Sequence, residues 1–192
     1  MTGARGAVFL DRDGVLNAIV ERGGRPESPR ELAEFVLVAE ARDSVRRLRA
    51  AGLPVFVVTN QPDVARGLLP APALEAMMRR LTDHVGVDDT RVCPHEDRHG
   101  CACRKPAPGM ILELAEHWGV DTGQSFMVGD TWRDMDAGRA AGCRTVLLRT
   151  WYNDDADGDM TVSDLGEAVD RILAAHADGG AVSGRGPADG AG

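Results

Sequence analysis

Ala7-Val8-Phe9-Leu10-Asp11-Arg12-Asp13-Gly14-Val15-Leu16-Asn17 is the stretch on which the fold depends. Its apolar run between Gly6 and Asp11 is too short for an ordinary helix and is typical of a strand buried on both faces. The strand ends at Asp11 and Asp13, and Gly14 can adopt the positive φ that turns the backbone over the strand end. Ligands bind at the carboxyl edge of an open α/β sheet. The stretch therefore predicts a parallel sheet with an acidic turn at its binding edge.

Two carboxylates in such a turn suit phosphoryl transfer. One can attack phosphorus to form an aspartyl phosphate, and the other can donate a proton and later accept one from water. An isolated Asp-x-Asp pair is more often only a polar turn. Polar groups at later strand ends decide between these two interpretations.

Further strand ends carry matching polar groups. A second apolar run, 53–58, leads into Thr59, Asn60 and Gln61, and a third, 125–129, leads into Asp130. A hydroxyl at a strand end can hold a phosphoryl oxygen, so we expect Thr59 to make that contact. Asn60 either fixes the loop or touches the substrate. The basic pair Arg104-Lys105 would supply positive charge to the same site.

Bulk composition is that of a globular α/β protein. The chain has 192 residues, of which 43% are hydrophobic and only 4% aromatic. Asp11 interrupts the first apolar run, and no run of about 18 apolar residues occurs, so we expect a cytoplasmic protein without a membrane span. The net charge of −8 is concentrated after Asn153. The remainder is nearly neutral, which argues against a nucleic-acid surface.

Periodicity predicts the remaining elements. Residues 18–34 are rich in Gly, Pro and polar side chains and are expected to form a long loop. Its arginines, Arg22, Arg25 and Arg30, could meet a second anionic group of a substrate or simply be solvated. A further strand is expected over 144–148, and helices are expected over 40–51, 71–85, 108–118, 133–141 and 162–175.

Cysteines gather in one short segment, 93–103. Three of the four cysteines lie there together with histidines. Three thiolates and one imidazole complete a tetrahedral zinc shell, and disulfides are rare in the cytoplasm. Because protein would fill every ligand position, the ion would be structural and would hold Arg104-Lys105 over the site. The candidate ligands are Cys93, Cys101, Cys103 and either His95 or His99.

Together these motifs resemble those of the haloacid dehalogenase (HAD) superfamily of phosphatases. The combination of DRDGVLN, TNQ, the CPH and CAC of the cysteine segment, and CRKPAPGM is similar to the subfamily typified by D-glycero-D-manno-heptose 1,7-bisphosphate 7-phosphatase. Histidinol-phosphate phosphatases are related to it. The resemblance spans about residues 6–149. It implies a Rossmann-like open parallel sheet with helices on both faces, a minimal cap, and a zinc-bound loop that helps to shape the pocket.

The resemblance also implies roles for individual residues. Asp11 would be the nucleophile and Asp13 the general acid and base. Mg²⁺ would be held by the Asp11 carboxylate, the backbone carbonyl of Asp13 and the Asp130 carboxylate. Lys105 would neutralise the phosphoryl group and Asp11, and Arg104 would contact the substrate. These roles offset the repulsion between a carboxylate and a phosphate dianion.

Further features of the sequence are the histidine ligand of the zinc, Asp134, and the residues that depart from the subfamily motifs. The resemblance favours His95 over His99 as the zinc ligand. Asp134 lies one helical turn beyond Asp130 and could bind Mg²⁺ through water, orient Lys105, or favour the helix dipole. The subfamily usually has Ser-Gly where this chain has Pro62-Asp63, and a lysine where it has Thr131. These differences bear on the sugar and not on the phosphatase chemistry.

We expect one HAD-like domain over 1–176, with a zinc loop at 93–103 and a disordered tail over 177–192, where Gly and Ala dominate. The predicted protein is a monomeric Mg²⁺-dependent phosphomonoesterase that acts on a small sugar phosphate, with a heptose bisphosphate preferred and histidinol phosphate second. It has no nucleic-acid or membrane partner. A catalytically inactive, zinc-stabilised phosphate-binding module is the alternative from another class, and the intact acids and lysine argue against it.

Overall fold

A six-stranded parallel sheet forms the centre of the computed structural model, which describes residues 5–182, with side chains placed through Asp178. The strand order is β5-β4-β1-β6-β7-β8. After β1 the chain builds one half of the sheet outward and then returns to build the other half from β6, so the order reverses beside β1. Such a reversal opens a crevice at the carboxyl ends of the strands. The strands are β1 (Val8–Leu10), β4 (Val55–Asn60), β5 (Asp89–Cys93), β6 (Phe126–Gly129), β7 (Arg144–Leu148) and β8 (Met160–Val162).

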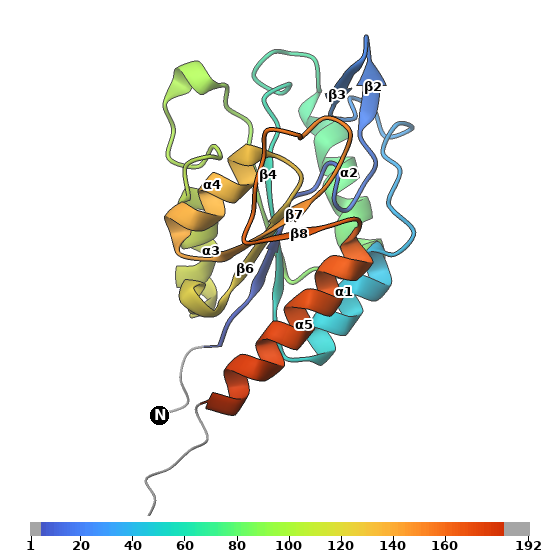
Figure 1. Cartoon of the computed structure of the whole chain (residues 1–192). Coiled ribbons are helices and arrows are strands. Elements are labelled where there is room, and N and C mark those ends of the chain that lie inside the picture. Colours follow the sequence, from blue (N-terminus) through green and yellow to red (C-terminus); the bar gives the residue numbers. More distant parts are fainter. Residues whose placement is uncertain (1–4, 183–192) are drawn as a thin grey trace, which may run out of the picture.

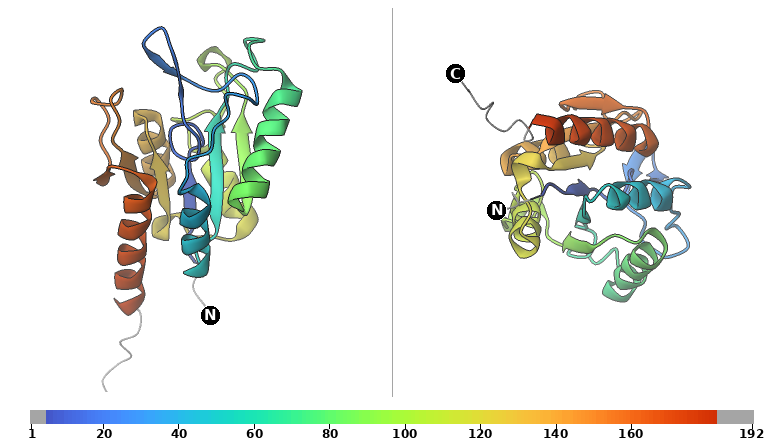
Figure 2. Two further views of the ribbon diagram at one scale, coloured as in Figure 1. Left: turned by 90° about the vertical axis from the view of Figure 1, so that its right-hand side faces the viewer. Right: turned by 90° about the horizontal axis from the view of Figure 1, so that it is seen from below.

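Helices cover both faces of this sheet (Figures 1 and 2). Alternate residues of a strand point to opposite faces. In β1, Val8 and Leu10 pack in the core that contains the first helix group, whereas Phe9 packs in the core that contains the second. The first group is α1 (Ala41–Ala50), α2 (Ala71–Val85) and α5 (Leu165–Val182), and the second is α3 (Gly109–Trp118) and α4 (Trp132–Ala141).

The predicted fold class is confirmed, and most predicted elements agree with the observed ones within one or two residues. The helix expected over 71–85 is α2, which ends at Gly86 in a left-handed conformation with φ 80°. The strand expected over 144–148 is β7. The chain also contains short 3-10 helices at Asp97–His99 and Thr122–Gln124. Among the described residues, no helix combines the length and apolar character needed to span a membrane.

The prediction of a long loop over 18–34 was wrong for residues 20–27. β2 (Val20–Arg22) and β3 (Arg25–Glu27) form an antiparallel hairpin. Its turn is Gly23-Gly24, with φ of 60° and 73°. Two adjacent glycines with positive φ are the signal of a two-residue hairpin turn, whereas a high glycine content alone fits irregular structure equally well.

Three further differences concern edge and terminal elements. β5 was not predicted, because it is only half-buried and polar for most of its length. The helix expected from 162 begins at Leu165, since Val162 ends the unpredicted strand β8. α5 continues to Val182, beyond the expected domain boundary at 176, so the prediction of disorder does not hold for 177–182. The rest of the predicted tail lies outside the described residues.

Candidate active site

The carboxyl ends of the sheet strands open into a cavity of about 380 Å³. Figure 1 shows the β2–β3 hairpin, the segment around Asp97–His99 and the β7–β8 loop at this same end of the molecule. Each candidate lining residue follows a strand or lies in a loop at this edge. Side chains that are far apart in the sequence therefore meet here, including Asp11, Asp13, Asn60, Arg104, Lys105 and Asp130.

Lys105 lies among the acids and is 2% exposed. Its ammonium Nζ is 2.8 Å from Asp11 Oδ1 and 2.5 Å from Asp134 Oδ1, and it donates to the carbonyl of Val58 at 2.8 Å. Burial opposes the positive charge, but the carboxylates of Asp11 and Asp134 outweigh it and raise the pKa of Lys105. The ammonium therefore remains charged.

The acids around Lys105 carry more negative charge than one ammonium can balance. Ligand oxygens of Asp11, Asp130 and Asp134 all lie within 4.8 Å of one another. Burial raises the pKa of Asp11 to about 7, although Lys105 opposes the shift. Burial, together with Asp134 and Asp11, also raises the pKa of Asp130 well above its usual value.

This set of groups fits a divalent cation. Asp130 Oδ1 is buried and has no hydrogen-bond partner among the described residues. Unpaired buried carboxylate oxygens are costly, and hard cations such as Mg²⁺ bind carboxylates of this kind. A cation would also relieve the mutual repulsion that, after burial, contributes to the raised pKa values of Asp11 and Asp130.

The Asp13 carboxylate is stabilised by donors from several segments. It accepts from Arg12 Nε at 3.0 Å, Asn17 at 2.9 Å, Gln61 at 2.7 Å and the Ser28 hydroxyl at 2.8 Å. Burial alone would raise the pKa of Asp13, but Arg12 and the hydrogen bonds outweigh it and lower the pKa below its usual value. Asp13 is therefore a carboxylate in the free protein.

The cavity lining includes Asn60 and Asp134 but not Thr59. Asn60 lines the cavity, and its amide exchanges hydrogen bonds with the backbone N–H and C=O of Lys105, at 3.1 and 3.0 Å. Thr59 is 1% exposed and does not line the cavity; its hydroxyl accepts from Gln61. Asp134 both contacts Lys105 and caps α4, because its Oδ2 accepts from the Thr131 N–H at 3.0 Å.

The cavity lining does not include Arg22, Arg25 or Arg30. Arg30 Nε lies 2.7 Å from Asp63 Oδ2, and Arg22 pairs with Glu27 and Glu34. The Arg22–Glu34 pair joins the hairpin to the segment that follows it, and the Arg30–Asp63 pair joins that segment to the loop after β4. The alternative in which these arginines meet a substrate anion therefore has no support in the geometry.

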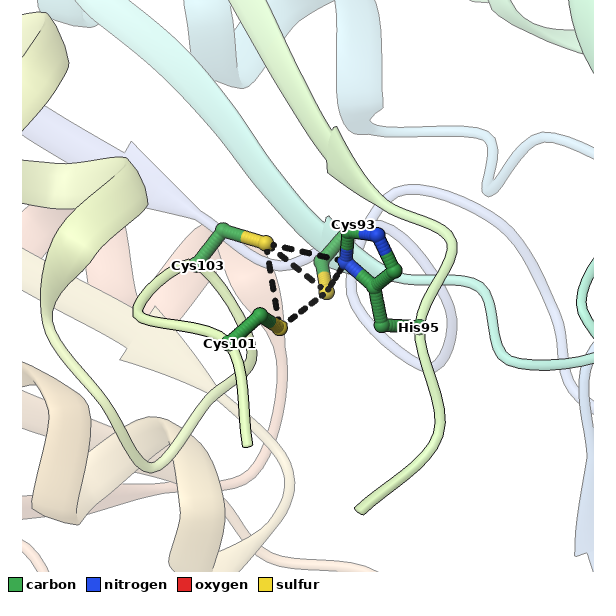
Figure 3. A group of neighbouring side chains, drawn as sticks. All are labelled: Cys93, His95, Cys101 and Cys103. Atoms are coloured by element: carbon green, nitrogen blue, oxygen red, sulfur yellow. Dashed lines mark hydrogen bonds between the residues drawn. The ribbon is translucent and has the colours of Figure 1, made fainter. Parts of the chain in front are cut away.

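The predicted zinc ligands lie together and point toward a common centre (Figure 3). The three thiol sulfurs are 3.2 to 3.6 Å apart, and His95 Nδ1 is 3.4 Å from Cys103 Sγ. His99 is outside this group, since its Nδ1 accepts from the Glu96 N–H at 3.0 Å. The set Cys93, His95, Cys101 and Cys103 could hold one metal ion.

Arg104 connects this cluster to the cavity. Its guanidinium donates to the His95 carbonyl at 3.0 Å and to Asp97 Oδ1 at 2.6 Å. The next residue, Lys105, is fixed from the other side by Asn60. The cysteine segment and the end of β4 thus position the two adjacent cations.

Several residues of the site stand in no recognisable sequence motif. Tyr152 donates from its hydroxyl to Asp130 Oδ2 at 2.5 Å, and burial raises the pKa of that hydroxyl, which keeps it protonated. Asn153 donates to the Asp130 carbonyl at 2.8 Å. Ser28 reaches Asp13 from beyond the hairpin. No local pattern could have indicated these contacts, because each joins segments that are distant in sequence.

This chain is similar in sequence to known HAD-like phosphatases. The HAD-hydrolase-like family model matches residues 102–168. A D-glycero-beta-D-manno-heptose-1,7-bisphosphate 7-phosphatase of Pseudomonas aeruginosa is 38% identical over 152 residues, which are 77% of this chain and 83% of that protein. The protein of the same name from Escherichia coli K12 is 35% identical over 185 residues and 90% of each chain.

The fold of this chain is also similar to that of a solved phosphatase structure. The D,D-heptose 1,7-bisphosphate phosphatase of B. bronchiseptica, crystallised with magnesium and phosphate, superposes with a TM-score of 0.76 and 31% identity. The match covers 88% of this chain and 98% of that one. The likeness extends over nearly the whole fold described above.

Proposed function

Because the chain belongs to the family of HAD-like phosphatases that includes the D-glycero-beta-D-manno-heptose-1,7-bisphosphate 7-phosphatases, we propose that it hydrolyses the 7-phosphate of a heptose 1,7-bisphosphate with the help of Mg²⁺. The observation that carries this proposal is the meeting of Asp11, Asp13, Lys105 and Asp130 at one sheet edge. A phosphate-binding module would have no use for a buried pair of acids facing a phosphate dianion.

Asp11 acts as the nucleophile. One of its carboxylate oxygens attacks phosphorus, the bond from phosphorus to the sugar oxygen breaks, and an aspartyl phosphate results. Lys105, 2.8 Å from Asp11 Oδ1, reduces the repulsion between the carboxylate and the incoming phosphate. Arg104 contacts the substrate from the cavity wall.

Asp13 moves the protons. A substrate phosphate repels the Asp13 carboxylate and favours its protonation, so Asp13 can give a proton to the leaving sugar oxygen. The donors of the free site, including Gln61 and Ser28, then stabilise the resulting carboxylate. That carboxylate takes a proton from water, whose oxygen attacks phosphorus and releases Asp11 and inorganic phosphate.

Asp11, the backbone of Asp13 and Asp130 would hold Mg²⁺. Support comes from the donor set itself, in particular the unpaired Asp130 Oδ1. When bound, the ion supplies positive charge that offsets the charge of the phosphoryl group.

Cys93, His95, Cys101 and Cys103 would hold a structural zinc ion. Their close approach supports this assignment. Since all ligand positions would be filled by protein, the ion takes no part in the chemistry and stabilises the loop that carries Arg104 and Lys105.

The first test is Asp11→Asn, assayed by phosphate release. We expect turnover to be abolished with the fold retained, because the amide is isosteric but a poor nucleophile. The exposed Asp154→Asn serves as a charge-matched control and should keep wild-type turnover. Persistent hydrolysis by Asp11→Asn would refute the nucleophile assignment.

A substrate screen tests the second part of the proposal. Phosphate release should be fastest with a heptose 1,7-bisphosphate when it is compared with histidinol phosphate, other sugar phosphates and nucleotides. A higher kcat/KM for histidinol phosphate would overturn the substrate assignment and leave the phosphatase chemistry in place.

A further inference from the structure

The loop between β7 and β8 holds Asp130 at two points. Tyr152 donates from its hydroxyl to the carboxylate Oδ2 at 2.5 Å. Asn153, 2% exposed, donates to the backbone carbonyls of Asp130 and Leu148 at 2.8 and 2.7 Å. The amide oxygen of Asn153 accepts from the Thr150 N–H at 3.0 Å. The backbone after β6 and the loop after β7 are therefore joined where Asp130 enters the cavity.

The two oxygens of the Asp130 carboxylate differ in their surroundings. Oδ2 accepts the tyrosine hydrogen bond, whereas Oδ1 is buried without a hydrogen-bond partner in the described part of the chain. The ammonium of Lys105 is directed at Asp11 and Asp134 and not at Asp130. The hydroxyl of Tyr152 thus fixes one oxygen and leaves the other available to a ligand.

Gly14 leaves room for this hydrogen-bonded pair. A Cβ at position 14 would lie 2.0 Å from Asp130 Oδ2 and 2.8 Å from the Tyr152 hydroxyl. Its φ of +80° also disfavours any other residue. The backbone of the first turn is therefore packed directly against the two bonded oxygens, which restricts their movement.

We infer that Tyr152 is a positioning residue that orients the Asp130 carboxylate for the divalent cation, with Oδ1 as the ligand atom. The inference rests on the proposed function, in which Asp130 binds Mg²⁺. Partners of a metal-binding carboxylate fix its orientation, and their removal usually weakens metal binding by about 10- to 100-fold. Tyr152 also lines the cavity, so the rival explanation is direct contact with the substrate.

The test is Tyr152→Phe, which removes only the hydroxyl. Calorimetric titration with Mg²⁺ of the protein freed of Mg²⁺ by buffer exchange, with its zinc retained and without substrate, should give a dissociation constant about 10- to 100-fold higher than that of the wild type. In turnover assays at saturating Mg²⁺, the KM for substrate should stay within about twofold. The thermal unfolding midpoint in Mg²⁺-free buffer without a chelator checks that the variant is folded.

Two matched variants complete the experiment. Trp151→Phe alters the exposed aromatic neighbour of Tyr152 and keeps the hydroxyl, so its Mg²⁺ affinity should equal that of the wild type. Asp130→Asn tests the underlying assignment and should nearly abolish Mg²⁺ binding.

The contrary results separate an error about Tyr152 from an error about Asp130. Unchanged Mg²⁺ affinity in Tyr152→Phe, with binding lost in Asp130→Asn, overturns the positioning role and leaves the proposed function intact. A raised KM for substrate with unchanged Mg²⁺ affinity assigns Tyr152 to substrate contact. Unchanged affinity in Asp130→Asn removes Asp130 from the cation site, and the inference falls with it.

Discussion

Lys105 is the residue on which the charge balance of the site depends. Its ammonium is nearly inaccessible to water and lies between Asp11 and Asp134. Removing one member of a buried ion pair leaves its partners charged and unpaired, which costs far more than a surface ion pair contributes. We therefore expect the same residue to affect both the free energy of unfolding and the approach of an anionic substrate.

Lys105→Met should abolish most phosphate release and lower the free energy of unfolding by about 3 kcal/mol in Mg²⁺-free buffer without a chelator. Urea denaturation measures the second effect. Mg²⁺ should recover part of the lost stability, because a cation at the acids replaces part of the missing charge.

A double variant provides the control for this prediction. In Lys105→Met with Asp134→Asn, one repelling carboxylate is removed, and the free energy of unfolding should rise above that of the single variant. If the single variant is as stable as the wild type in Mg²⁺-free buffer, the charge balance described for Lys105 is wrong.

At the scale of elements, the edge strand β5 depends on polar contacts with α3. Asp89, which begins β5, accepts from the indole N–H of Trp118 at the end of α3, at 3.1 Å. It also accepts from the Thr90 N–H at 2.7 Å and from Arg91 at 3.0 Å. Burial opposes the charge, but these donors outweigh it and lower the pKa of Asp89 below its ordinary value.

The lowered pKa predicts the sign of a pH dependence. A carboxyl whose pKa falls on folding stabilises the protein above the unfolded pKa, about 3.9, and this contribution is lost as pH falls through the folded value. Asp89→Ala should therefore cost about 1–2 kcal/mol at pH 7. The difference from wild type, measured by urea denaturation, should shrink below about pH 4. A difference that grows in acid would contradict this account.

The cysteine segment, residues 93–103, is expected to affect the active site through its metal content. We expect metal analysis to find about one zinc ion per chain, the number that one shell of three thiolates and an imidazole binds. Cys101→Ser should lower the zinc content and kcat/KM together, because Arg104 and Lys105 follow the cluster directly. Cys143→Ser, in a buried cysteine outside the cluster, is the matched control and should keep its zinc. Full zinc loss without any change in kcat/KM would separate the loop from the active site.

At the scale of the whole molecule, the sheet carries an apolar core on each face. Leu48 of α1 belongs to one core and Leu114 of α3 to the other, and both side chains are fully buried. The strands supply residues to both cores in alternation. A strand that leaves the sheet therefore removes residues from both cores at once. The two cores should therefore unfold together.

Leu48→Ala and Leu114→Ala should each cost about 2–5 kcal/mol. In both variants, tryptophan fluorescence and far-UV circular dichroism should report the same unfolding midpoint, which is the mark of a cooperative transition. Two separate transitions in either variant would contradict a single domain.

The fold could be predicted wherever a segment carried its own signal. The buried strand before Asp11 and the helix from Ala71 to Val85 have the apolar spacing of their final structure. The hairpin at 20–27 and the edge strands β5 and β8 could not be found in this way. Their stability comes from turn geometry and from pairing with distant strands, and not from an apolar period of their own.

The sequence by itself determined which chemical groups the site contains, because Asp11, Asp13, Lys105 and Asp130 stand in motifs at strand ends and those ends share one edge in a parallel sheet. Only the tertiary structure decided how each group is held. Asp134 joins Lys105 to the start of α4, Ser28 donates to Asp13, and Tyr152 donates to Asp130. These contacts link segments that have no regular spacing in the chain, so only their packing in three dimensions creates them.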